Sequence, residues 1–499
     1  FDKITTVSNT KFDNVFAKIH TMDTNTPVQN IRIKQNAEFI NADIYNIVFE
    51  VRKDIFDANV VVRGTKFYCD SLNFSPAALN IVNAVSVVIE DSKFIDRVGG
   101  IIVDNSGLPI QGKASGRIAN NTVSFNADVA SKGTKAAKRV GIEISNANID
   151  IEDNEIEGGD EGIVMKTSSS GRISNNTVNF TADVASKKGI YDKTAIIVSD
   201  NSDATEITGN SIINNDSENE NVTGIEINGS KADINYNTLL FEGWEEQTVL
   251  SRIGIKLVNM TDTLRIYNNT IYNTLQAFNN STGALPMPVD IINNIFWSDQ
   301  GTYTTINDTT GVIFYNNCFI DSTNITGNGN IFVDPVINSS WNNDFTLVST
   351  SPCINAGMII DGVHSFSAGK TVYYYGTAPD IGAKEFYQEL TAPANVTTTV
   401  TSTDFTFGWD AVPGFNEYIV YSSNDPYGSF TVETITTSLS YTASVGTKKF
   451  YYVVASTGSK SYLYDNTVVT EKTQTNGKET AVTKTDKRNG LRINKKANR

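Results

Sequence analysis

The sequence predicts an all-β protein built mainly as a parallel β-helix, with a smaller β-sandwich behind it. Three observations support this fold class: only 19% of the 499 residues are charged, β-branched residues are frequent, and one six-residue pattern recurs throughout residues 62–319. β-Branched residues favour strands. A pattern that returns at near-regular intervals is typical of a solenoid, in which each repeat stacks on its neighbours.

The repeated pattern is apolar-x-x-Asn-x-apolar, as in Ile118-Ala-Asn-Asn-Thr-Val123. The Asn position is occupied in order by Thr65, Ser92, Asn121, Asn154, Asn176, Asn210, Asn237, Asn269, Asn294 and Asn317. A second pattern, Gly-apolar-x-apolar, falls between these anchors, for example at Gly141-Ile-Glu-Ile144. Each repeat therefore contains at least two short alternating strands joined by polar bends.

One repeat cannot bury its apolar face alone, whereas stacked repeats pair strands at ~4.8 Å and bury a continuous core. The Asn side chains are then expected to form a hydrogen-bonded column along one bend. Residues 117–132 recur closely as 172–187, two repeats later, which places Asp128 and Asp183 in equivalent loops. A repeated ligand-binding loop and a recent duplication both explain this similarity.

Composition limits the partners. The net charge of −15 argues against nucleic acid, because phosphate binding needs a basic face. Residues 474–499 are basic, which indicates a solvated tail or a segment that docks on an acidic surface. The three Cys residues match no zinc motif, although a Cys318–Cys353 bridge is conceivable. No apolar run is long enough for a membrane span, and a first residue of Phe1 is compatible with a cleaved signal peptide.

Over residues 30–340 the repeat resembles the right-handed parallel β-helix proteins of the pectate-lyase-like superfamily. A series that follows is similar to the closing segment of many secreted bacterial β-helix proteins: Asn330-Ile-Phe-Val-Asp-Pro335, Asp344-Phe-Thr-Leu347, Ser351-Pro-Cys-Ile-Asn-Ala-Gly357 and Pro379-Asp-Ile-Gly-Ala-Lys-Glu-Phe386. This resemblance implies export to the cell surface and a β-helix with its C-terminal cap over 30–387.

Two further domains flank the helix. Residues 1–29 are expected to cap it, and the spacing of Phe12, Val15, Phe16 and Ile19 predicts a short helix there. Residues 388–473 alternate in short strands, and Trp409 followed by Tyr418-Ile-Val-Tyr421 resembles a fibronectin type III module. That resemblance implies a β-sandwich spacer or interaction domain with Trp409 in its core, followed by the basic tail over 474–499.

Asp160 and Glu161 are candidate catalytic acids. Their stretch resembles polygalacturonase-type hydrolases, which pair Asp residues on adjacent coils with a nearby His. Here the position for the acid one coil earlier is Val140, and no Gly-His-Gly follows. Gly158-Gly-Asp-Glu-Gly162 is also a good bend sequence.

A lyase would instead use a basic residue to remove the proton α to a uronate carboxylate, often with Ca²⁺ as a cofactor. Arg252, Lys256 and Arg265 are the candidates, and we expect Lys256 and Arg265 to share one face. Asp200, Asp203 and the run 214–220 offer oxygen ligands for Ca²⁺, although solvated loops explain them as well. No metal site is assigned.

Aromatic residues on neighbouring coils are candidate sugar-stacking platforms: Phe241, Trp244, Tyr267, Tyr272 and Trp297. Burial within coils or under loops is the competing interpretation. Because no complete catalytic constellation is present, the sequence favours an extracellular structural, adhesive or carbohydrate-binding scaffold whose partners are polysaccharide or further copies of itself. A polysaccharide lyase or glycoside hydrolase acting on acidic polysaccharide is the alternative.

Overall fold

The computed structural model describes the chain except for residues 1–3, 8–9, 14–15, 19–28, 34–36, 46, 53–57, 69–78, 97–98, 107–112, 126–137, 181–190, 216–219, 242–250, 261–263, 283–288, 300–304, 308–310, 323–324, 340–342, 361–362, 365–377, 387–391, 413–416, 426–429, 445–448, 457–470, 476–477 and 483–499. Two compact units are present, residues 1–360 with 380–385 and residues 361–379 with 386–499.

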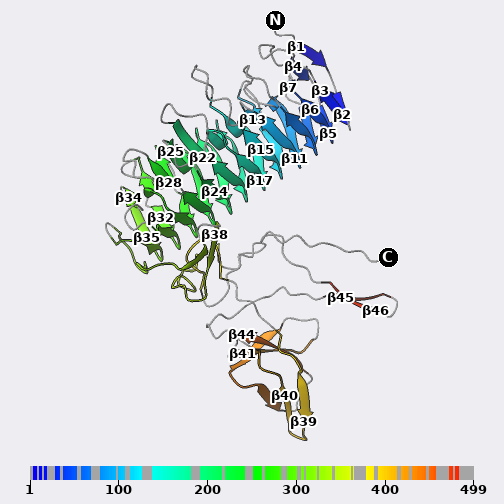
Figure 1. Cartoon of the computed structure of the whole chain (residues 1–499), viewed down its shortest axis with the longest axis vertical. Coiled ribbons are helices and arrows are strands. Elements are labelled where there is room, and N and C mark those ends of the chain that lie inside the picture. Colours follow the sequence, from blue (N-terminus) through cyan, green and yellow to red (C-terminus); the bar gives the residue numbers. More distant parts are fainter. Residues whose placement is uncertain are drawn as a thin grey trace. The chain divides into compact units, whose positions relative to one another are not determined.

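The first unit is a parallel β-helix made of three twelve-stranded sheets, named A, B and C here, and each coil contributes one strand to each sheet (Figure 1). Sheet A contains β1 (Ile4–Val7), β4 (Gln29–Ile33), β7 (Ile47–Arg52), β10 (Leu79–Val82), β13 (Gly99–Asp104), β16 (Val140–Ser145), β19 (Glu161–Lys166), β22 (Tyr191–Ser199), β25 (Glu220–Asn228), β28 (Arg252–Val258), β31 (Gln276–Asn280) and β34 (Thr305–Asn307).

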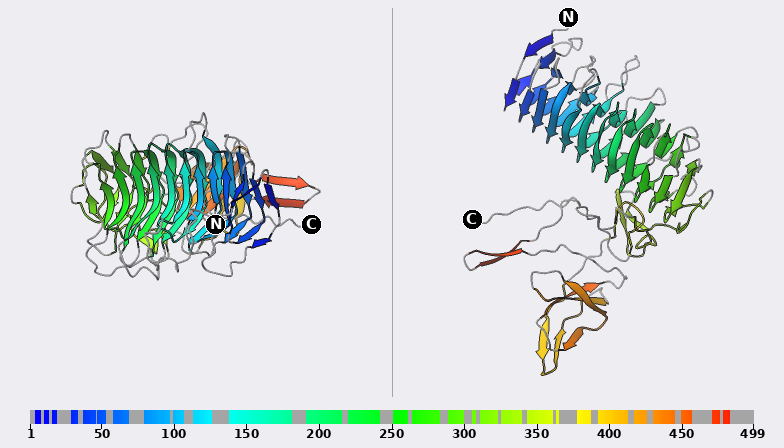
Figure 2. Two further views of the ribbon diagram at one scale, coloured as in Figure 1. Left: turned by 90° about the horizontal axis from the view of Figure 1, so that it is seen from above. Right: turned by 180° about the vertical axis from the view of Figure 1, so that it is seen from behind.

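Sheets B and C follow sheet A in every coil, as the stacked strands in Figure 2 show. Sheet B contains β2 (Thr10–Asp13), β5 (Ala37–Ile40), β8 (Ala58–Arg63), β11 (Ala84–Glu90), β14 (Ala114–Ala119), β17 (Ala147–Glu152), β20 (Ser170–Ser174), β23 (Asp203–Thr208), β26 (Lys231–Asn235), β29 (Arg265–Tyr267), β32 (Val289–Ile292) and β35 (Val312–Tyr315). Sheet C contains β3 (Phe16–Lys18), β6 (Asp43–Tyr45), β9 (Lys66–Tyr68), β12 (Lys93–Asp96), β15 (Thr122–Phe125), β18 (Glu155–Glu157), β21 (Thr177–Phe180), β24 (Ser211–Asn214), β27 (Thr238–Phe241), β30 (Thr270–Tyr272), β33 (Ile295–Trp297) and β36 (Cys318–Phe319).

Register places the apolar repeats in rows that face one core. Ile142 pairs with Ile163, which pairs with Ile196, and all three are fully buried. The glycines that begin the sheet A motif mark a close approach to the next coil. A Cβ on Gly162 would lie 2.5 Å from the carbonyl oxygen of Ala195 and 2.8 Å from Val178 Cγ1. The Gly-apolar-x-apolar pattern thus reflects tight packing between coils.

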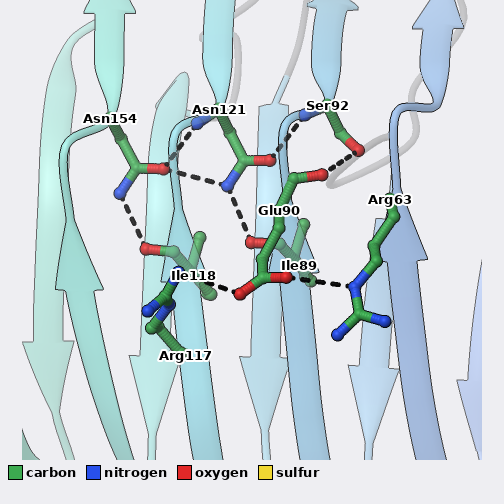
Figure 3. Close-up of polar contacts among 8 residues, drawn as sticks. All are labelled: Arg63, Ile89, Glu90, Ser92, Arg117, Ile118, Asn121 and Asn154. Atoms are coloured by element: carbon green, nitrogen blue, oxygen red, sulfur yellow. Dashed lines mark hydrogen bonds and ion pairs between the residues drawn. The ribbon is translucent and has the colours of Figure 1, made fainter. Parts of the chain in front are cut away.

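The predicted Asn column is confirmed. Asn121 Nδ2 donates to Asn154 Oδ1 at 2.9 Å, and the same oxygen accepts the backbone N–H of Asn121 at 3.1 Å (Figure 3). Each interior amide also donates to a carbonyl of the preceding coil, as Asn121 does to Ile89 at 3.0 Å. The column runs one step further than the sequence predicted, because Asn317 Nδ2 donates to Asn330 Oδ1 at 3.2 Å.

The residue before each anchor turns the chain sharply. Asn120 and Asn175 both have φ of 56°, in the left-handed region that Asn tolerates better than most residues. Glycine takes the same role at Gly209, where φ is 66°. The frequent Asn-Asn pairs of the sequence therefore combine a turn residue with a ladder residue.

A second, shorter ladder lies at the bend between sheets A and B, and the sequence did not predict it. Ser169 N–H donates to Ser202 Oγ at 3.1 Å, and Ser202 N–H donates to Ser230 Oγ at 3.1 Å. Ser169 is fully buried, while Ser202 and Ser230 are 2% and 4% exposed. Small hydroxyl side chains here satisfy backbone donors that would otherwise be buried without partners.

The N-terminal expectation is wrong in one respect. Of the four residues expected to line a short helix, Phe12 lies in β2 and Phe16 in β3, which pair in parallel with β5 and β6. Val15 and Ile19 lie outside the described residues. β1 also pairs with β4, so the described residues between 4 and 18 give one strand to each of the three sheets, within the span expected to be a cap. The strands continue the stack because each gains a full ladder of backbone hydrogen bonds from the next coil.

Beyond β36 the first unit continues into β37 (Ile337–Ser339) and β38 (Asp344–Leu347), an antiparallel pair. Segment 380–385 returns to the β-helix, where Ala383 N–H donates to Thr270 Oγ1 at 2.9 Å and Gly382 N–H donates to Asn293 O at 2.7 Å. The closing segment is thus discontinuous, and residues 361–379 belong to the second unit.

The second unit contains two three-stranded antiparallel sheets. These are β39 (Thr397–Val400), β40 (Asp404–Gly408) and β43 (Ser440–Ser444), and β41 (Glu417–Ser423), β42 (Thr431–Thr436) and β44 (Phe450–Ser456). Trp409 is 5% exposed and packs with Phe407 and Tyr418, so its predicted core position is confirmed. A further hairpin, β45 (Glu471–Thr475) with β46 (Lys478–Val482), crosses the expected start of the basic tail.

Candidate functional site

Glu161 is the first residue of sheet A strand β19, and Asp160 lies in the bend just before it. Each carboxylate is bound by a cation at the end of the connection that precedes β16. Asp160 accepts the backbone N–H of Arg139 at 2.8 Å and its guanidinium at 3.3 Å. Glu161 accepts Lys138 Nζ at 2.5 Å. Charge-assisted bonds of this kind orient a bend, so both acids have a structural role already.

Register tests whether these acids could act as an inverting pair. Glu161 lies opposite Val140 on one side and Thr194 on the other. The residue one coil before Glu161 is therefore Val140 in the paired strands, as the sequence alignment of the repeats predicts. An inverting hydrolase needs carboxylates roughly 6.5–9.5 Å apart on opposite faces of the sugar ring. Asp160 and Glu161 are instead consecutive in the chain, and each is paired with its own cation.

The basic candidates lie on different sheets. Lys256 is in β28 of sheet A, where Nζ contacts Glu226 Oε2 at 3.0 Å. Arg265 is in β29 of sheet B, where it forms two hydrogen bonds to Asp233, one of them Nε to Oδ1 at 3.1 Å. The expectation that Lys256 and Arg265 share a face is wrong, since a bend separates them. Both are paired with an acid one coil earlier.

Tyr272 and Trp297 occupy one outward row of sheet C, but the closing segment covers this row. Tyr272 is 2% exposed, and its ring centroid lies 5.8 Å from that of Phe345. Its hydroxyl donates to Asp299, and Trp297 packs half-buried against the same cluster. The interpretation of Tyr272 as an exposed stacking platform is wrong, because β38 lies over it.

Tyr267 is also buried, on the outward face of sheet B. It is 4% exposed, its hydroxyl accepts Asn235 Nδ2 at 3.0 Å, and the guanidinium of Arg265 lies 5.7 Å from its ring centroid. Burial raises the pKa of Tyr267 above its usual range. The surface role expected of Tyr267 is therefore wrong, and Phe241 is fully buried as well. Asp128, Asp183 and Trp244 lie outside the described residues.

Four charged residues lie in one row at the start of sheet A, a grouping that the sequence did not predict. They stand two positions before the Gly or Ala of their strands and comprise Arg139, Asp160, Lys193 and Arg252. Lys193 lies opposite Val222, which lies opposite Arg252. Lys193 is 2% exposed and Arg252 is 8% exposed. Aligning the Gly-apolar motifs and reading two positions back would have revealed this row.

Several candidate metal ligands, one of the two histidines and two of the three cysteines lie in the part of the chain that the structure describes. No group of three or more His, Cys, Asp or Glu side chains gathers there in a way that could hold a metal ion. Part of the candidate Ca²⁺ run 214–220 lies outside the description. His364 is 6% exposed, and burial lowers its pKa to about 4. Cys318 and Cys353 are both buried, and each carries a free thiol in this structure.

Solved structures match this chain at low sequence identity. The PL6 family alginate lyase AlyGC matches at 14% identity and a TM-score of 0.34, covering 69% of this chain and 52% of its own. The chain therefore spans about half the length of that lyase. A tailspike protein mutant of E. coli bacteriophage HK620, in complex with a hexasaccharide, matches at 10% identity and a TM-score of 0.23, covering 91% of this chain and 86% of its own.

A second HK620 tailspike double mutant matches at 9% identity and a TM-score of 0.21. No protein-family model matches the chain, and no curated protein does. Among the described residues, none form a helix that is long and apolar enough to cross a membrane.

Proposed function

We propose that this chain is an extracellular surface protein whose β-helix is a rigid scaffold that binds or displays carbohydrate. The observation that carries the proposal is the pairing of four of the five candidate catalytic side chains with an opposite charge: Asp160 with Arg139, Glu161 with Lys138, Lys256 with Glu226, and Arg265 with Asp233. Glu226 and Asp233 lie one coil earlier than the side chains they pair with, and Lys138 and Arg139 adjoin the preceding sheet A strand, β16. Side chains paired in this way stabilise the stacked coils and are not available to bind substrate.

Rigidity is the second support. The Asn column satisfies buried donors in coil after coil, and ion pairs such as Arg63–Glu90–Arg117 join three coils on the outward face of sheet B (Figure 3). We further propose a right-handed coil, since parallel crossover connections in proteins are right-handed in about 98% of cases. The second unit is proposed to be a fibronectin type III-like spacer, because its two antiparallel sheets enclose a Trp–Tyr core.

The binding surface is proposed to lie at the bend between sheets C and A. The connection from Phe125 to Val140 and the one from Phe180 to Tyr191 carry the repeated Asp128 and Asp183. These connections vary in length while the Asn bend does not. Variable loops on a rigid scaffold are where recognition usually develops.

The test uses the full chain with alginate, polygalacturonate, chondroitin sulfate and, as a neutral glycan, dextran. Affinity electrophoresis measures binding, while absorbance of unsaturated ends and reducing-end assays measure turnover. We expect retention by at least one glycan without turnover, and loss of retention in the D128N/D183N double variant. The exposed Asp290→Asn variant is the matched control. A chain that no glycan retains would overturn the carbohydrate role.

An acidic-polysaccharide lyase is the alternative, and the place of the basic candidate Arg252 favours it. Arg252 begins β28, next to the bend between sheets C and A where the binding surface is proposed. Release of unsaturated ends by the wild-type chain, abolished by Arg252→Met at an unchanged unfolding midpoint, would establish this alternative in place of the scaffold.

A further inference from the structure

Two cysteines lie where the last coil of the β-helix meets the segment that closes it. Cys318 begins β36, the final strand of sheet C, and Cys353 lies in a turn of the closing segment. Both are fully buried. The chain between them passes through β37 and β38, which cover the outward row at Tyr272.

The two thiols are in direct contact. The side chains of Cys318 and Cys353 form a hydrogen bond, which together with burial raises the pKa of Cys318. The Cys318 thiol also donates to the carbonyl oxygen of Val333 at 3.2 Å. The sulfur atoms need only close from hydrogen-bonding distance to a bond of about 2.05 Å.

Backbone hydrogen bonds hold both cysteines in place. Cys318 N–H donates to Asn294 O at 2.8 Å, which fixes it to the last steps of the Asn column. Cys353 N–H donates to Ser351 Oγ at 3.2 Å, and Cys353 O accepts Ile381 N–H at 3.0 Å. The second bond ties Cys353 to the returning segment 380–385. Both backbones are therefore anchored while the thiols face each other.

The surroundings argue against a catalytic role for these thiols. A reactive cysteine needs a lowered pKa, supplied by a nearby cation or a helix N-terminus. The neighbours of Cys318 are instead a second thiol, the carbonyl of Val333 and the carboxylate of Asp334, and the latter further disfavours the thiolate. A buried pair of neutral thiols in contact is suited to forming a structural bond.

We propose that Cys318 and Cys353 form a disulfide that covalently closes the C-terminal end of the β-helix. The co-reactant is a small-molecule disulfide such as oxidised glutathione. One cysteine thiolate attacks it and releases one glutathione thiol, giving a mixed disulfide. The second cysteine displaces the other glutathione, so the protein loses two hydrogens and two electrons while the reagent gains them. Because both thiols are buried, this exchange is slow in the folded chain. It is faster during folding, when the thiols are still accessible.

The experiment refolds the full chain from reducing denaturant with oxidised and reduced glutathione, alkylates remaining thiols, and maps peptides without reduction. We expect a peptide linked through Cys318 and Cys353 and an alkylated Cys69. Thermal unfolding should be higher than for the reduced chain by roughly 5 °C, because the bond restricts the unfolded state.

Variants separate the pair from the third cysteine. Cys69→Ser should retain the linked peptide and the redox-dependent shift in Tm, whereas the matched Cys353→Ser should lose both. Alkylation of all three cysteines in wild-type chain refolded under these oxidising conditions would overturn the proposal, as would a linked peptide that contains Cys69. The peptide map needs only the wild-type chain, so a variant that fails to fold does not obscure the result.

Discussion

Asn121 and Asn154 lie 33 positions apart, yet one oxygen of Asn154 accepts both the side-chain amide and the backbone N–H of Asn121, at 2.9 and 3.1 Å. The relationship repeats along the column, so each interior Asn accepts two hydrogen bonds from one neighbour and donates two to the other. A single substitution therefore leaves groups without partners in more than one coil.

Replacing a central member of the column should destabilise the β-helix strongly. In Asn176→Ala, the backbone and side-chain N–H groups of Asn154 lose their acceptor, and the carbonyl of Ile151 loses its donor. Leaving such buried groups unpaired costs about 1–3 kcal/mol each, so we expect a loss of about 3 kcal/mol or more. Urea unfolding followed by circular dichroism measures it. The exposed Asn148→Ala is the control, and equal stability of the two variants would contradict the prediction.

Gly116 should tolerate no side chain. A Cβ at this position would lie 1.7 Å from the carbonyl oxygen of Val87 on the neighbouring strand. Since Gly116 pairs with Val87 in the ladder, the strands must separate or shift register to admit a methyl group. We expect Gly116→Ala to lower the free energy of unfolding by about 2–3 kcal/mol. Ser115→Ala, at the exposed position beside it, should change stability by less than about 0.5 kcal/mol.

The ion pair Arg139–Asp160 should stabilise the fold more than the ion pair Arg265–Asp233. The side chains of Arg139 and Asp160 are 13% and 19% exposed, whereas those of Arg265 and Asp233 are 50% and 26% exposed. Solvent screens the second pair more effectively. Double-mutant cycles with Arg→Met and Asp→Asn should give about 1–2 kcal/mol of coupling for Arg139–Asp160 and below about 1 kcal/mol for Arg265–Asp233. The reverse order would refute this prediction.

Acid should destabilise the chain through His364. Burial lowers its folded pKa to about 4, whereas an unfolded His titrates near 6.5. The neutral folded form is then fully stable above about pH 6.5, and as pH falls toward 4 the unfolded state binds a proton that the folded state does not. The loss reaches at most about 3 kcal/mol. His364→Asn should reduce the change of the unfolding midpoint with pH between pH 7 and 4.5, while His20→Asn serves as control. Identical pH profiles for wild type and His364→Asn would exclude this mechanism.

Much of the β-helix was determined by the sequence alone, because its information is local. A bend residue with positive φ, an Asn and two flanking apolar residues occupy six positions, and the period sets which of these groups stack. For the same reason, the repeat pattern did not predict every hydrogen-bonded ladder. The column extends to Asn330 after a shorter interval, and the Ser169–Ser202–Ser230 ladder uses side chains too common to stand out.

Tertiary structure decided the rest of the candidate site. Tyr272 alternates along its strand as an outward residue should, yet β38 lies over it after folding back from more than 60 positions away. Lys256 and Arg265 are close in the chain, but a bend puts them on different sheets. Burial and charge pairing depend on segments that meet only after the coils have stacked. A pattern that places a side chain on a face therefore does not tell what covers that face.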